Sequence, residues 1–183
     1  MDNPAFCTKR LLLLIGLIAV IIISDQLTKW WVLEFIIQQE HTPLDFFSWL
    51  GANERLPFYG LEVLPFFNLV MVWNEGVSFG LMSSLENSHI WLSLLSIAVS
   101  TGLAVWMVTS NRLSTTIPLA MVIGGALGNV IDRLRFGAVA DFIDLHLMGY
   151  HWPAFNLADA MITIGVALLL IDGLFFEPRH KKG

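Results

Sequence analysis

Four long apolar stretches constrain the fold of this chain more than any other feature. Each can supply the roughly 20 apolar residues that a helix needs to cross a bilayer. The runs are long and lack the alternation of a half-buried strand, so we expect helices. They cover residues 11–37, 89–108, 116–135 and 156–176. Of 183 residues 56% are hydrophobic and only 14% are charged, so we predict a single all-α membrane domain over residues 1–183.

The N-terminal segment is expected to remain as a permanent span. Lys9 and Arg10 precede an apolar run, as in a secretory signal, but no Ala-x-Ala cleavage pattern follows. The helix must instead continue through Asp25 and Lys29 to reach the length of a span. Cys7 is the only cysteine, which excludes an internal disulfide and a cysteine-based zinc site.

The segment between the first two spans, residues 38–86, is too long for a simple connection. Its many aromatic residues suit the membrane–water interface. Residues 66–73 are rich in β-forming types and precede a turn signal at 74–76, which predicts extended structure. An amphipathic surface helix near residues 43–51 is the alternative, and both can apply to different parts. We therefore predict a small, partly extended subdomain on the outer face.

Basic residues in the short flanks predict the orientation. If both termini are cytoplasmic, the inner side holds Lys9, Arg10, Arg112, Arg179, Lys181 and Lys182. Arg133 and Arg135 then lie on the outer side, although basic flanking residues favour the cytoplasmic side. We therefore expect them to have specific partners. The net charge of −5 argues against nucleic acid as a partner.

Three aspartates converge on one depth of the predicted bundle. At a rise of 1.5 Å per residue, Asp25 lies roughly 21 Å and Asp132 roughly 24 Å across from the inner boundary. Asp159 lies about 5 Å below the outer boundary, because its helix enters from that side. Asp172 belongs to the inner side, where we expect it to extend toward water with Glu177 and the basic tail. Carboxylates in hydrocarbon are costly and are rare without a task, so this convergence predicts a membrane-embedded site.

Two polar groupings in the spans have both structural and functional interpretations. Asp25 and Lys29 are four residues apart, which favours an ion pair on one helix face. Gly124 and Gly128 have the spacing that permits close helix approach in lipid. The next turn adds Asn129 and Asp132 on the same side, which leaves packing and lining of a site as equal alternatives.

The connection to the fourth span carries further acids. Asp141 and Asp144 lie in an apolar loop, where acids are often merely solvated. Asn156 and Asp159 also form a capping-box pattern at the start of the last helix, so capping competes with catalysis for Asp159. The spacing of the histidines near Asp144, at 146 and 151, matches no zinc signature, so we predict no metal site.

Five sequence blocks in order resemble the lipoprotein signal peptidases, the type II signal peptidases of bacteria. The blocks are DQLTK at 25–29, NEGVSFG at 74–80, GGALGNVIDR at 124–133, GAVADFID at 137–144 and FNLAD at 155–159. Two positions depart from the family pattern. Ala140 stands where valine is usual, and the segment 38–67 is longer than typical.

The resemblance implies an aspartyl endopeptidase of the bacterial cytoplasmic membrane, with its active site near the outer face. Such an enzyme removes the signal peptide from prolipoproteins that carry a diacylglyceryl group on a cysteine, cutting just before that cysteine. It implies that Asp141 and Asp159 are the catalytic pair. The implied site-lining residues are Asn74, Asn129, Asp132, Arg133 and Asn156, and the implied structural support is Asp25, Lys29, Gly124 and Gly128.

Two neighbouring carboxylates suit this reaction, because they cannot both ionise cheaply and therefore share a proton. No cofactor is then needed. We expect a monomer whose partners are the lipidated substrate and membrane lipid. A proton or ion translocator is an alternative, although the inner halves of the helices are almost purely apolar. A non-enzymatic membrane scaffold would leave the outer carboxylates unexplained.

Overall fold

The computed structural model describes residues 4–38, 42–76 and 87–175, and the side chains from residue 8 onward. Four helices in these ranges are long and apolar enough to cross a membrane: Thr8–Ile37, Ser88–Thr109, Leu113–Phe136 and Leu157–Phe175. They match the four predicted spans to within a few residues. Some predicted features lie outside the described residues. They are position 176 at the end of the last predicted span, the acid Glu177, residues 77–80 of the second sequence block, and the C-terminal basic residues.

The first span consists of α1 (Pro4–Trp31) and a π-helical continuation, η1 (Val32–Ile37). The others are α3 (Ser88–Thr109), α4 (Leu113–Phe136) and α5 (Leu157–Phe175). Helix α4 contacts each of the other three, and it has the most buried residues among the four spans. It ends at Phe136 and is capped by Gly137, whose φ of 70° lies in the left-handed region that glycine adopts without strain.

Glycines in α4 allow the helices to approach one another closely. A Cβ added at Gly124 would lie 3.0 Å from the Ile21 side chain on α1. One at Gly125 would lie 2.4 Å from the backbone oxygen of Ala158 on α5. The small residues therefore place α1 and α5 directly against α4, which brings their polar side chains into one contact region.

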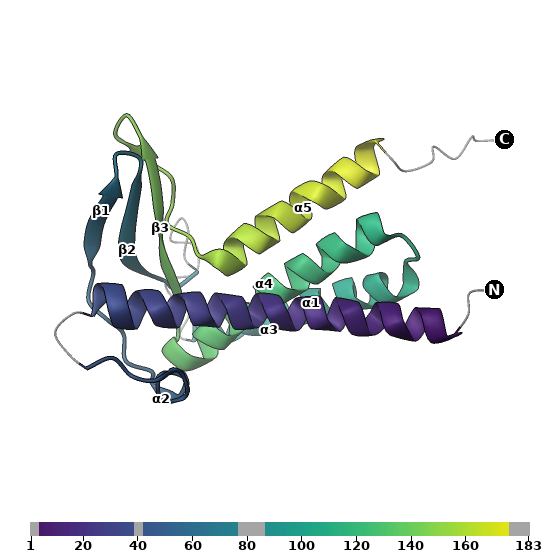
Figure 1. The fold of residues 1–183 in the computed structure, drawn as a ribbon, viewed down its shortest axis with the longest axis horizontal. Coiled ribbons are helices and arrows are strands. Elements are labelled where there is room, and N and C mark those ends of the chain that lie inside the picture. The colour runs from purple at the N-terminus through teal and green to yellow at the C-terminus, as the bar shows by residue number, and fades with distance from the viewer. Residues whose placement is uncertain (1–3, 39–41, 77–86, 176–183) are drawn as a thin grey trace.

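A four-stranded antiparallel sheet lies at one end of the bundle, away from the beginning of α1 and the end of α5 (Figure 1). Its strands, in spatial order, are β1 (Gly60–Leu64), β2 (Phe67–Asn74), β3 (Val139–Leu147) and β4 (Tyr150–His151). Both interpretations of the first long connection are confirmed, since a short surface helix, α2 (Phe46–Gly51), precedes the strands. The Asp45 side chain caps α2 by accepting bonds from the backbone nitrogens of Phe47 and Ser48.

The prediction of a loop at residues 138–144 is wrong. These residues enter β3, which pairs with β2, so the sheet also draws on the connection between α4 and α5. Residues 139–142 are all buried, so the strand begins without the alternation of polar and apolar residues that identifies a half-buried strand.

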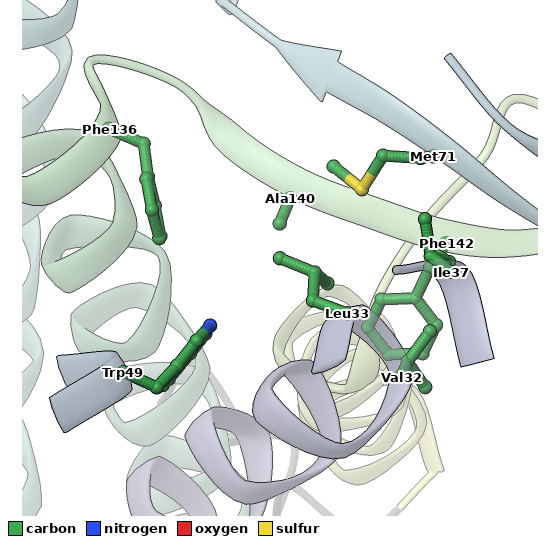
Figure 2. Close-up of a cluster of buried hydrophobic side chains, with 8 residues drawn as sticks. All are labelled: Val32, Leu33, Ile37, Trp49, Met71, Phe136, Ala140 and Phe142. Atoms are coloured by element: carbon green, nitrogen blue, oxygen red, sulfur yellow. The ribbon is translucent and has the colours of Figure 1, made fainter. Parts of the chain in front are cut away.

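A cluster of buried side chains joins the sheet to the bundle (Figure 2). Leu33 from η1, Trp49 from α2, Met71 from β2 and Phe136 from α4 face the same space as Ala140 of β3. Val32, Ile37 and Phe142 complete it. Because Ala140 immediately precedes Asp141, this packing fixes the backbone that carries Asp141.

Candidate active site

Two amide side chains connect the carboxylates of Asp141, on β3, and Asp159, in the first turn of α5. The Nδ2 of Asn156 donates to Asp141 Oδ1 at 2.8 Å and to Asn129 Oδ1 at 3.1 Å. The Nδ2 of Asn129 in turn donates to Asp159 Oδ1 at 2.7 Å. The two acids, 18 residues apart in sequence, are therefore held in one hydrogen-bonded group together with both asparagines.

Asn74 contacts the same group from the end of β2. Its Nδ2 donates to Asp141 Oδ2 at 3.0 Å, while its Oδ1 accepts a bond from the backbone nitrogen of Gly76 at 2.8 Å. The register that pairs Val72 with Asp141 and Asn74 with Val139 places this amide beside the carboxylate. Asp141 therefore receives a side-chain donor on each of its oxygens.

The environment of Asp141 favours its protonated form. Its exposed fraction is only 1%. Burial, and next the negative charge of Asp159, raise the pKa of Asp141 to about 7, although bonds from Asn74 and Asn156 act in the opposite direction. A carboxyl group with this pKa exchanges a proton near neutral pH, as a general acid or base requires.

Asp159 caps the start of α5 and also belongs to the hydrogen-bonded group. Its backbone nitrogen donates to Asn156 Oδ1 at 2.9 Å, and its Oδ2 accepts a bond from the Asn156 nitrogen at 3.3 Å, so the capping box forms. Its other oxygen accepts the bond from Asn129. Capping thus fixes the carboxylate in the group rather than competing with a role there.

A buried ionic triad supports both acids from inside the bundle. Lys29 Nζ lies 2.7 Å from Asp25 Oδ2 and 2.7 Å from Asp132 Oδ2, and the side chains of all three residues are fully buried. Asp25 Oδ1 accepts a bond from the backbone nitrogen of Ala158 at 3.1 Å. Asp132 Oδ2 accepts one from the Ala140 nitrogen at 3.2 Å. The triad therefore holds the residue immediately before each candidate catalytic aspartate.

Gly128 makes room for the triad. A Cβ at this position would lie 2.8 Å from Asp25 Oδ2, and Gly124 one turn earlier packs against α1 in the same way. Lys29 also donates to Asn129 Oδ1 at 3.4 Å, which joins the triad to the asparagine that contacts Asp159. Asp132, expected among the residues that line or support the site, lies in this supporting layer.

Sequence reasoning missed Gln26, whose side chain bonds to both acids of the triad. Its Nε2 donates to Asp132 Oδ1 at 2.9 Å and to Asp25 Oδ2 at 3.2 Å, and its Oε1 accepts a bond from Arg135 Nη1 at 3.2 Å. The signal was present in the sequence, because an amide side chain inside a predicted span needs polar partners.

The two arginines near the end of α4 have different surroundings. Arg135 donates to the backbone oxygens of Trp49 and Ala52, and its guanidinium lies 4.1 Å from the centre of the Trp49 ring. It thereby attaches α2 to the bundle, which is the specific partner that its position suggested. Arg133 interacts electrostatically with Asp159, Asp132 and Asp141, and its buried Nε has no hydrogen-bond partner among the described residues.

Asp144 lies on β3 but outside this group. It accepts a bond from Asn68 Nδ2 at 2.8 Å, and its Oδ2 lies 2.9 Å from His151 Nδ1. His146 stacks on His151 with a ring-centre separation of 4.7 Å. In the ranges that the structure describes, three or more histidine, cysteine or acidic residues nowhere form a group that could hold a metal.

Asp172 differs from its expected behaviour. We predicted that it extends toward water, but it is buried and paired with Arg112 Nη2 at 2.7 Å. Thr115 Oγ1 also donates to it at 3.1 Å. Both partners lie at or near the beginning of α4, and pairing there satisfies the carboxylate without exposing it.

The chain is similar to known proteins over most of its length. The profile of a family described as signal peptidase (SPase) II matches residues 17–175. A lipoprotein signal peptidase of Rhodopseudomonas palustris is 40% identical over 177 residues, which cover 94% of this chain and 96% of that protein. One of Vibrio cholerae serotype O1 is 47% identical over 125 residues, covering 67% and 71%.

A solved structure shares the fold. It is described as a bacterial membrane enzyme determined by the in meso method at 1.9 Å resolution. It matches with a TM-score of 0.66 and 29% sequence identity, over 90% of this chain and 94% of that one.

Proposed function

Because the chain belongs to the signal peptidase (SPase) II family, we propose that it is a membrane-embedded aspartic endopeptidase that cleaves signal peptides from prolipoproteins. The substrate carries a diacylglyceryl group on a cysteine, and the cut falls immediately before that cysteine. The observation that supports this proposal best is the hydrogen-bonded group that joins Asp141, Asp159, Asn129 and Asn156.

In the proposed reaction, Asp141 and Asp159 act on one water molecule and one peptide bond. The ionised carboxylate takes a proton from the water molecule as the water oxygen attacks the carbonyl carbon. The protonated carboxyl at the same time gives its proton to the carbonyl oxygen. As the tetrahedral intermediate collapses, the carboxyl that took the water proton donates it to the leaving nitrogen and the carbon–nitrogen bond breaks. The proton on the former carbonyl oxygen returns to the other carboxylate, so the pair again holds one shared proton. The raised pKa of Asp141 suits the protonated partner, although the pair titrates as one unit.

Neighbouring donors supply the remaining stabilisation. Arg133 Nε is buried without a partner among the described residues, and it interacts electrostatically with both Asp141 and Asp159. A cation in this position stabilises the oxyanion of the intermediate. Asn74 holds Asp141 from the other side, at the end of β2.

The location of the site suits a lipid-linked substrate. Asp159 lies in the first turn of a membrane-capable helix, and Asp141 lies just beyond another, so the scissile bond would lie at the membrane boundary. We infer that this boundary faces the outside of a bacterial cytoplasmic membrane and that both termini are cytoplasmic, because most basic flanking residues are at the other end. The active unit would be a monomer.

A synthetic precursor peptide tests the proposal. The purified protein in lipid nanodiscs is mixed with the peptide carrying a diacylglyceryl cysteine or with the same peptide unmodified, and fragment masses are measured. We expect one cut, before the cysteine, in the lipidated peptide only. Cleavage elsewhere, or equal cleavage of both peptides, would contradict the proposed specificity.

A further inference from the structure

The end of the sheet farthest from α4 gathers exposed apolar side chains. Phe67 pairs with Leu145, so the turn between β1 and β2 and the turn between β3 and β4 lie at this same end. The backbone nitrogen of His146 donates to the Phe66 oxygen at 3.0 Å, which joins the two turns. We call this surface the sheet tip and define it by Leu64, Phe66, Leu145, Leu147, Met148, Tyr150 and Trp152.

The sheet tip is strongly exposed and lacks formal charge. Met148 is 99% exposed, and Leu147 and Tyr150 are each 70% exposed. Neither residues 63–69 nor residues 145–155 include a lysine, arginine, aspartate or glutamate. Contiguous exposed apolar surface of this kind marks an interaction site. With no charges to pair and with Tyr and Trp present, its composition matches the belt that membrane proteins place at the lipid–water interface.

The orientation of the sheet brings the tip to the level at which the first span ends. In Figure 1 the strands run across the direction of α1, so the sheet extends sideways from the bundle instead of continuing along its axis. Along that axis, the tip does not pass the end of η1, which is the last part of the first membrane-capable helix. Trp31 and Phe35 near that end are 55% and 48% exposed, as expected for side chains that face lipid.

We propose that the sheet tip inserts into the interfacial layer of the same bilayer that holds the four helices. The occupant of this surface is phospholipid, because the uncharged tip lies, along the axis of α1, at the depth where the first span ends. Met148 lies seven residues beyond Asp141, a distance of roughly 23 Å along the strand. Strand β3 therefore connects a lipid-seated tip to Asp141 and fixes the depth of that residue in the membrane.

Single nitroxide labels test this placement. On a Cys7→Ser background, cysteines replace Met148 or Phe66 in the sheet tip, Phe35 as a lipid-facing reference, or Glu62 as an exposed charged position of the same sheet. The labelled proteins are placed in nanodiscs of phosphatidylethanolamine and phosphatidylglycerol. Power saturation then measures the collision of each label with oxygen, which partitions into lipid, and with a water-soluble nickel chelate.

We expect the ratio of oxygen to nickel collisions at 148 and 66 to approach the ratio at 35 and to exceed that at 62 severalfold. Ratios at 148 and 66 equal to the ratio at 62 would overturn the proposal. The tip would then lie in water, either free or available to a protein partner. Met148 and Phe66 are exposed, so these changes leave the core intact. The same measurement on Asp141→Asn protein needs no turnover, so failure of this inference is separable from failure of the proposed peptidase activity.

Discussion

The carboxylate of Asp132 accepts a hydrogen bond from the backbone nitrogen of Ala140 at 3.2 Å, one residue before Asp141. Asp25 does the same for Ala158, one residue before Asp159. Lys29 lies between these two carboxylates. A buried ionic triad thus positions two acids that come from segments far from α1 in sequence, and this relationship leads to several expected outcomes.

Replacing Lys29 with methionine is expected to destabilise the protein. It leaves Asp25 and Asp132 as uncompensated buried acids, and breaking a buried ion pair in this way costs about 3–5 kcal/mol. Thermal unfolding in nanodiscs measures the loss. Arg112→Met is the control, because in its ion pair the Arg112 side chain is exposed and only Asp172 is buried, and the pair lies at the other end of α4. An equal effect of both changes would argue against a special role for the triad.

Gly128→Ala is expected to be destabilising and to reduce activity. The new Cβ would lie 2.8 Å from Asp25 Oδ2, and overpacking of this kind costs about 1–3 kcal/mol. Gly102 of α3 has open space around it, so Gly102→Ala should leave the protein as stable as before or stabilise it by up to about 1 kcal/mol. Unfolding temperatures and cleavage rates of the two variants provide the comparison.

The pH dependence of cleavage should report the pKa of Asp141. Burial and Asp159 raise this pKa to about 7, so the shared proton is lost as the pH rises through about 7, and kcat/KM should fall on the alkaline side. The contribution of Asp141 to the stability of the folded protein should also fall as the pH rises. A carboxyl group whose folded pKa exceeds its unfolded pKa of about 3.9 contributes stability below that value, and the contribution is lost as the pH rises through the folded pKa.

Asn74→Ala should shift this alkaline limb. The bond from Asn74 lowers the pKa of Asp141, so its removal is expected to move the limb to higher pH while reducing the maximum rate. A pH profile of kcat/KM for both proteins measures the shift. A limb displaced to lower pH would show that Asp141 does not carry the titrating proton.

Arg135→Lys should loosen α2 although the charge is retained. Lysine lacks the planar guanidinium that lies over the Trp49 ring. Its single ammonium also cannot replace both Nη1, which donates to Gln26, and Nη2, which donates to the two carbonyls. We expect a loss of about 1–2 kcal/mol, in the range of a partly desolvated cation–π contact. A double-mutant cycle with Trp49→Leu measures the coupling, and strictly additive effects would show that the two side chains act independently.

The spans were predictable because long apolar runs in lipid have few alternatives to helix. The surface helix and β2 were visible as well. Strand β3 was not, because its buried start shows no alternation and its partner lies some 70 positions earlier. Helical spacing likewise gave the face of α4 that carries Asp132, but not whether α1 or the substrate covers that face.

The two arginines near the end of α4 have surroundings that the sequence could not assign. The distribution of basic residues in the flanks of the spans identified Arg133 and Arg135 as exceptions that need partners. Only the packed structure distinguishes Arg135, which attaches α2, from Arg133, whose Nε is unpaired among the described residues beside the carboxylates. Gln26 was not predicted although it lies next to Asp25, because a buried amide costs less than a buried charge and therefore indicates a partner less strongly.

The most direct test of the account compares three aspartate-to-asparagine changes in the cleavage assay on the lipidated peptide. Asp141→Asn and Asp159→Asn should each lower kcat by at least about 100-fold, the smaller limit for loss of a general acid or base. Asp144→Asn, on the same strand but bonded to Asn68 and His151, should retain most of the activity. All three proteins should be present at comparable levels. Substantial turnover by either of the first two variants would contradict the proposal that this pair performs the reaction.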